Sequence, residues 1–202
     1  MRADYKANYD RIAKDHVAHW RKTGENPFQR HEHVEALVAS TLALVYKYSK
    51  PGEAVLDAGC GIGELLTRMQ DRERHGCDFA RDYLTVLGER GINAVYAELE
   101  ALPYPDGRFA LVTATDILEH VLDLNAVVAE LLRVVRPGGH LIVRSPEAED
   151  LTRYLDPKYP YEFVHLRRFD EPSFRLLFTR VFSCQVVETV PIRGERNVVV
   201  RK

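Results

Sequence analysis

The chain has 202 residues and a formal net charge of −2 at pH 7, which is enough sequence for one domain with a sizeable core. The balance of charges excludes the strongly basic surface of a typical nucleic-acid-binding protein, so we expect no nucleic acid as a partner. No apolar run approaches the roughly 20 residues of a membrane-spanning helix, and the polar first residues lack the apolar core of a signal peptide. We therefore expect a cytoplasmic protein, either a monomer or a homodimer.

The three cysteines, Cys60, Cys77 and Cys184, lie far apart in the sequence. They are odd in number and none belongs to a C-x-x-C pair, so the pattern indicates neither a zinc site nor a disulfide framework. A reducing cytoplasm is the simplest compartment for such a chain.

The first fifty residues are predicted to be mainly helical. Residues 24–27 read Gly-Glu-Asn-Pro and break the pattern, whereas residues 30–48 place apolar side chains at helical spacing. We expect residues 1–50 to form a helical cap over a ligand cleft, with Tyr9 and Trp20 as candidate substrate contacts. The alternative is that these helices only cover the sheet.

A glycine-rich stretch follows the first predicted strand. The apolar residues 54–56 close on Asp57, and glycines then occupy every second position at Gly59, Gly61 and Gly63. Residues 64–69 begin a helical pattern, so the stretch predicts strand, tight loop and helix. The glycines allow the backbone to approach a ligand closely, and a helix start offers free N–H groups.

The glycine spacing excludes two common phosphate-binding loops. The G-x-G-x-x-G fingerprint needs a glycine where this chain has Glu64, whose carboxylate would repel a pyrophosphate and disfavours a nicotinamide oxidoreductase. The phosphate loop G-x-x-x-x-G-K-[ST] is also absent. A D-x-G-x-G-x-G sequence after an apolar strand instead resembles motif I of the class I S-adenosylmethionine-dependent methyltransferases, whose ligand is a sulfonium cation. By this resemblance the cofactor site includes Asp57, Gly59, Cys60, Gly61 and Gly63. The alternative reading of the motif alone is a strand–helix turn without a ligand.

Two further strands are predicted to end in acids. Residues 74–78 end in Asp78, about twenty residues after the glycines, where an acid can accept both ribose hydroxyls of a nucleoside. Asp78 could equally cap the next helix, and with Phe79 it joins the predicted cofactor site. Residues 91–98 end in Glu98, and the resemblance implies that Glu98 and Leu99 recognise adenine, although Asp is more usual at the first position.

The fourth predicted strand, residues 111–116, leads into a phrase similar to the "D-x-L-E-H-V" motif of small-molecule methyltransferases, including those of quinone biosynthesis. Ligands of open α/β sheets sit at the carboxyl ends of the strands, which places Thr115 and Asp116 among the cofactor contacts. His120 is the first candidate catalytic residue because imidazole can accept a proton near neutral pH. The alternative is that it only shapes the cofactor wall.

Residues 145–170 are predicted to be a polar, aromatic substrate lid. His165 is the second candidate catalytic residue, and Tyr154, Tyr161 and Arg168 are candidate substrate contacts. The alternative is a solvated loop with surface charges.

The remaining pattern completes the fold. Residues 123–136 predict an amphipathic helix, residues 140–144 a fifth strand, residues 171–180 a short helix and residues 182–201 a β-hairpin. We expect an α/β fold: a doubly wound, mostly parallel seven-stranded sheet whose last strand is antiparallel. The methyltransferase domain is predicted to span residues 51–202.

The favoured function is transfer of a methyl group from S-adenosyl-L-methionine to oxygen or nitrogen of a small-molecule acceptor, with S-adenosyl-L-homocysteine as the product. The alternative is a catalytically inactive or partner-dependent cofactor-binding subunit. We expect no metal, because Asp116 stands where a metal-binding acid could sit but lacks a convincing set of further acids around it.

Overall fold

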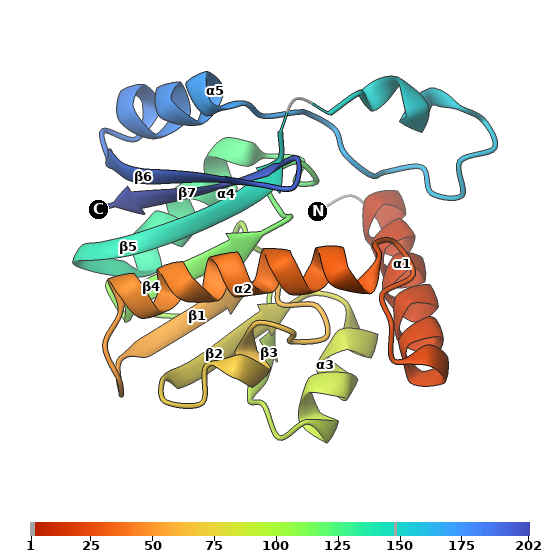
Figure 1. Ribbon diagram of the computed structural model, residues 1–202, viewed down its shortest axis with the longest axis horizontal. Helices are drawn as coiled ribbons and strands as arrows, with labels where there is room; N and C mark the ends of the chain where they lie inside the picture. Colours follow the sequence, from red (N-terminus) through yellow and green to blue (C-terminus); the bar gives the residue numbers. More distant parts are fainter. Residues whose placement is uncertain (1–2, 148) are drawn as a thin grey trace.

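The computed structural model describes residues 3–147 and 149–202. A seven-stranded sheet of order β3-β2-β1-β4-β5-β7-β6 forms its centre (Figure 1). The first five strands pair in parallel, and β7 is antiparallel to both of its neighbours. The predicted mostly parallel sheet with an antiparallel last strand is therefore confirmed. The strands are β1 (Ala54–Ala58), β2 (Glu73–Asp78), β3 (Ala94–Tyr96), β4 (Phe109–Thr115), β5 (Val135–Pro146), β6 (Gln185–Ile192) and β7 (Glu195–Arg201).

The helices are α1 (Ala3–Thr23), α2 (His31–Tyr48), α3 (Arg81–Glu89), α4 (Leu124–Val134) and α5 (Glu171–Leu176). Two short 3-10 helices, η1 (Leu66–Arg68) and η2 (Leu151–Leu155), and a π-helical turn, η3 (Leu177–Val181), complete the set. Within the described ranges, none of these helices combines the length and apolar character needed to traverse a lipid bilayer.

Apolar side chains that alternate between the two faces of the sheet form a hydrophobic cluster on each face. Side chains of a strand point to opposite faces in turn, so Val55 packs with Val45 of α2 on one face of the sheet. On the other face Leu56 packs in the same cluster as Leu131 of α4 and Phe174 of α5. Both faces are thus covered, as a parallel sheet requires.

The order in which successive strands join the sheet reverses at β1 and β4, which lie side by side and parallel although β2 and β3 separate them in sequence. Ligands of doubly wound sheets bind outside the carboxyl ends of the strands at such a switch point. Here the glycine loop follows β1 and residues 116–123 follow β4. Helix α1 stands across this end of the sheet rather than on a face (Figure 1).

The prediction of an α-helix after the glycine loop was wrong. Only η1 forms in this segment, and β2 then begins at Glu73. Buried Arg72 then turns the chain towards α2 by donating to the backbone and hydroxyl oxygens of Ser49. Two boundaries also differ from expectation, since β3 ends at Tyr96 and β5 already begins at Val135, with a register shift where it pairs with β4.

Candidate functional site

A cavity of about 820 Å³ lies at the carboxyl ends of β1, β2 and β4, within the range of small-molecule sites. Its walls come from the glycine loop, from α1 and α2, and from residues 149–165. Asn8 of α1 ties the last of these to the helix, because its side chain donates to the carbonyl of Phe163 (2.7 Å) and accepts from the N–H of Glu162 (3.0 Å). The cavity is thus closed over by segments from both halves of the chain.

The three glycines of the loop all adopt positive φ, of 72° at Gly59, 53° at Gly61 and 81° at Gly63. A Cβ on Gly59 would lie 2.2 Å from Cδ1 of Ile117, whereas the space beside Gly61 is open. Gly59 therefore allows the loop to approach the turn after β4, and Gly61 presents bare backbone to the cavity. Gly63 does not line the cavity; a Cβ there would lie 2.4 Å from Cδ2 of Leu87 in α3.

Two buried carboxylates flank this loop and line the cavity. Asp57 accepts a hydrogen bond from the Thr113 hydroxyl (2.6 Å). Asp78 accepts from the N–H groups of Gly61 (3.0 Å) and Ala80 (2.9 Å). Burial raises the pKa of Asp57 to about 7 and that of Asp78 to about 6, against these hydrogen bonds. Each carboxylate would be stabilised in its charged form by a cation in the cavity.

Most other predicted cofactor contacts also line the cavity, namely Cys60, Phe79, Leu99, Thr115 and Asp116. Glu98 does not; its carboxylate lies 3.6 Å from Nζ of Lys6, and its side chain is about one-third exposed. The neighbouring Ala97 and Leu99 face the cavity instead. The adenine-binding role of Glu98 stays a prediction that this geometry does not support.

A buried arginine that the sequence analysis did not single out holds Asp116. Arg144 of β5 contacts the Asp116 carboxylate through Nε (3.1 Å) and Nη2 (2.5 Å), and its Nε lies 2.9 Å from Glu195. Burial opposes ionisation of Asp116, but the charge and hydrogen bonds of Arg144 bring its pKa below the ordinary value. Asp116 has φ of 56°, a strained conformation that Asp tolerates better than most residues.

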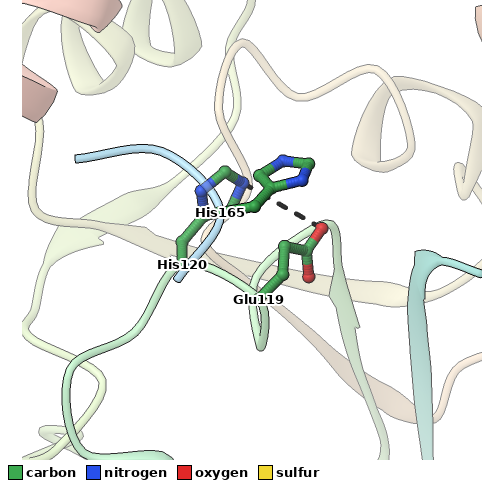
Figure 2. A group of neighbouring side chains, drawn as sticks. All are labelled: Glu119, His120 and His165. Carbon is green, nitrogen blue, oxygen red and sulfur yellow. Dashed lines mark ion pairs between the residues drawn. The ribbon is translucent and has the colours of Figure 1, made fainter. Parts of the chain in front are cut away.

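The two candidate catalytic histidines meet at one side of the cavity (Figure 2). Their rings are 4.6 Å apart between centroids and nearly perpendicular. His120 lies one residue beyond Glu119 in the turn after β4, and His165 reaches in from the far end of the predicted lid. The structure therefore brings together two residues that lie 45 positions apart in the sequence.

One nitrogen of each imidazole is already engaged. Nδ1 of His120 lies 3.0 Å from the carbonyl of Val164 and 2.8 Å from the hydroxyl of Tyr9. Because a carbonyl oxygen only accepts, this contact places a proton on Nδ1 and leaves Nε2 basic. Burial and the neighbouring His165 lower the pKa of His120 to about 4. Nδ1 of His165 contacts the carboxylate of Glu149.

The predicted substrate contacts divide into two groups. Tyr9, Tyr154 and Tyr161 line the cavity. Trp20 lies outside it, with the Arg90 guanidinium over its ring at 4.6 Å, and Arg168 is exposed on the surface. Their substrate-binding roles stay predictions without support from this geometry.

Three residues at the site were missed by the sequence analysis as site residues: Arg144, Glu149 and Glu195. A signal existed for Arg144, because an arginine at the end of the apolar run 141–143 must find a buried partner. The other two gave no signal, because their partners lie far away in the sequence.

Comparison with known proteins now identifies the chain. Residues 29–187 match the family described as "Methyltransferase domain". The chain belongs to this family. Its cofactor, as the sequence analysis predicted, is S-adenosylmethionine.

This methyltransferase is 32% identical over 131 residues to the ubiquinone/menaquinone biosynthesis C-methyltransferase UbiE of Shewanella halifaxensis, covering 57% of the present chain and 52% of UbiE. It is 34% identical over 112 residues to the malonyl-[acyl-carrier protein] O-methyltransferase of Serratia marcescens, covering 54% and 44%. The chain thus spans about half the length of these curated relatives.

A solved structure shares the fold over nearly the whole chain. It is an S-adenosylmethionine-dependent methyltransferase of Thermotoga maritima, described as a "possible histamine N-methyltransferase". The TM-score is 0.72 at 18% identity, over 98% of this chain and 99% of that one. At this identity the likeness shows the fold alone.

The cavity fits a cationic nucleoside. Gly61 has open space where a side chain would stand. The acids Asp57 and Asp78 are only 3% and 8% exposed, and none of their hydrogen-bond donors is a positively charged side chain. A sulfonium and an amino group would supply the charge that these buried acids lack.

Proposed function

We propose that this chain transfers the methyl group of S-adenosylmethionine to oxygen or nitrogen of a small-molecule acceptor. One observation carries the proposal: a single cavity has bare glycine backbone and buried acids at one end and paired imidazoles with tyrosines at the other. The first end matches the chemistry of a cationic cofactor. The second end offers groups that can hold and deprotonate an acceptor.

The cofactor would be held by the loop and by the strand ends. Asp57 and the residues 59–62 would contact its amino-acid portion, Asp78 and Phe79 its ribose, and Leu99 its adenine. Thr115 and Asp116 would lie beside the methyl group. When bound, S-adenosylmethionine supplies an electrophilic methyl carbon and a neutral thioether as leaving group.

The acceptor would lie between α1 and residues 149–165. The rings of Tyr9, Tyr154 and Tyr161 offer flat apolar walls with hydroxyl groups, which suit a small aromatic or conjugated molecule. His120 and His165 would face its reacting atom. Alignment of that atom with the methyl carbon is expected to contribute several kcal/mol, within the roughly 7–11 kcal/mol available to well-oriented reactions.

The curated relatives include one C-methyltransferase and one O-methyltransferase, so likeness alone leaves the acceptor atom open. Nε2 of His120 is unprotonated at neutral pH, because burial lowers the pKa of the ring to about 4, and as a weak base it suits an acceptor that must lose a proton. A hydroxyl is such a group, and a protonated amine is another.

Calorimetric titration with S-adenosylmethionine and with S-adenosylhomocysteine tests the proposal. We expect binding by the folded protein and, for Asp78→Ala, a loss of roughly tenfold or more, because Asp78 organises the glycine loop and would meet the ribose. Asp82→Ala, an exposed acid in the first turn of α3, is the matched control and should bind normally. Absence of binding to well-folded protein would refute the proposal.

An acceptor screen then addresses the alternative function. Transfer of a labelled methyl group from S-adenosylmethionine to an added hydroxyl or amine compound would support the proposed function. Excess unlabelled S-adenosylhomocysteine should inhibit this transfer. Tight cofactor binding with no turnover, even when a candidate partner protein is added, would favour an inactive subunit.

A further inference from the structure

Three side chains point towards one another beside the acceptor end of the cavity, whose wall includes two of them, His120 and His165 (Figure 2). Glu119, His120 and His165 each offer one donor atom, and these atoms all lie within 4.8 Å of one another. Glu119 and His120 come from the turn after β4, whereas His165 comes from the segment that closes the cavity. The cluster therefore exists only when that segment is packed in place.

Glu119 is 1% exposed, and neither of its carboxylate oxygens has a hydrogen bond of good geometry within the part of the chain that the structure describes, although the Ser145 hydroxyl lies beside it. Its closest positive candidate is Nε2 of His120, 4.0 Å from Oε1. A carboxylate removed from water without partners is costly, and buried acids are normally paired or bound to a metal. The Glu119 carboxylate is therefore an unpartnered group that faces two imidazoles.

The imidazoles are oriented as those of metal-binding histidines usually are. Nδ1 of His120 is hydrogen-bonded to the carbonyl of Val164, and Nδ1 of His165 contacts the carboxylate of Glu149. Such outer partners fix the ring and leave the other nitrogen free for an ion. In both rings that free nitrogen is Nε2.

We propose that Glu119, His120 and His165 bind a divalent cation of the zinc class at the acceptor end of the cavity. Two imidazole nitrogens and one carboxylate oxygen, with further positions open, are the donor set of catalytic zinc sites. Ligands about 2.0–2.1 Å from one ion are roughly 3.3 Å apart in tetrahedral geometry, so the three side chains close inward by about an ångström on binding.

The open positions of the ion face the cavity, because His120 and His165 line it. The next step rests on the proposed function. An acceptor hydroxyl bound to the ion would release its proton to solvent at a lower pH than in water. Both histidines would then act as metal ligands rather than as proton acceptors. This inference departs from the sequence-based expectation of no metal, which considered acids around Asp116 and not a histidine from the lid.

The experiment uses the full chain after removal of metal with a chelator and dialysis. Calorimetry with zinc chloride should show one saturable site per chain. His165→Ala should weaken this binding by roughly 100-fold or more, and Glu149→Gln by about 10–100-fold, the usual effect of losing an outer partner. The control is His75→Ala, whose imidazole lies 2.9 Å from Glu73 on β2 and outside the cavity; it should bind zinc normally.

Cobalt(II) substitution adds a readout independent of activity. Visible absorption of a four- or five-coordinate ion, without the near-ultraviolet band of thiolate ligands, is expected for two nitrogens and a carboxylate. A thiolate band would assign the metal to Cys60, Cys77 or Cys184 and overturn the proposal. So would unchanged zinc affinity in His165→Ala, or no saturable site in the wild-type protein.

Glu119→Gln is a second ligand variant, interpreted only if its circular dichroism and thermal transition match the wild type. Binding of S-adenosylhomocysteine to the metal-free protein separates the two proposals. If this nucleoside binds and zinc does not, the metal site fails alone. If zinc binds and the nucleoside does not, the methyl-transfer function fails and the metal site stands.

Discussion

At the scale of single residues, the site depends on backbone conformations that few side chains allow. Gly59 combines a φ of 72° with a Cβ position 2.2 Å from Ile117. Asp116 adopts a φ of 56° without being glycine, and its N–H donates to the carbonyl of Arg144 (2.9 Å). Strained residues of this kind persist when the surrounding structure determines them, and they gather at functional sites.

Gly59→Ala should lower both stability and cofactor affinity, because the added methyl group meets Ile117 and the positive φ disfavours any Cβ. We expect a loss of about 1–3 kcal/mol in the free energy of unfolding, measured by urea denaturation. Gly88→Ala is the matched control. Gly88 lies in α3 with open space beside its Cα, so alanine there should stabilise by about 0.5–1 kcal/mol. Equal effects of the two substitutions would contradict this account.

At the scale of elements, one charged group joins β5, β7, α2 and the turn after β4. Arg144 is 6% exposed, pairs with Asp116 and Glu195, and donates to the Thr41 hydroxyl of α2 (3.0 Å). Glu195 begins β7, which is antiparallel to β5. The closing hairpin is therefore tied to the cofactor end of the sheet through this arginine.

Arg144→Ala should destabilise the protein by about 3 kcal/mol, because it leaves the partly buried Asp116 and the buried Glu195 without the arginine that both contact. Thermal and chemical denaturation measure the loss. Arg175→Ala removes an exposed i,i+4 pair with Glu171 and should cost no more than about 0.5 kcal/mol. A loss at Arg144 as small as at Arg175 would show that the buried network contributes little.

At the scale of the whole molecule, buried groups with displaced pKa values make stability depend on pH. Burial raises the pKa of Asp57 to about 7 and that of Glu195 to about 8. The folded protein therefore keeps protons that the unfolded chain has lost, and this contribution disappears as pH rises through the folded pKa values. Burial lowers the pKa of His16 and His120 to about 4. Between about pH 4 and pH 6.5, the ordinary histidine value, the unfolded chain binds protons that these two histidines have lost in the folded protein. Only in that range do the histidines make stability rise with pH and so offset the effect of the acids.

Stability without cofactor should consequently fall between pH 6.5 and about pH 8.5, where only the acids titrate. S-adenosylmethionine, whose positive charge favours ionised Asp57, should stabilise the protein more at pH 8 than at pH 6.5. Thermal unfolding across this range, with and without the cofactor, measures both trends. Asp57→Asn should flatten the slope, and an unchanged slope in that variant would assign the titration to other groups.

The sequence by itself determined the succession of strands along the chain, the mostly parallel sheet, the position of the glycine loop and the strand-end residues Asp57, Asp78 and Asp116. These depend on local periodicity and on residue types next to one another in the chain, so a linear pattern contains them. Only the tertiary structure decided that Glu98 faces Lys6, that Arg144 holds Asp116, and that the segment after Gly63 forms only a short 3-10 helix. It also decided that His165 meets His120 and Glu119. Such contacts join segments far apart in the sequence, and their geometry is set by packing against the completed sheet, which leaves no mark on local spacing.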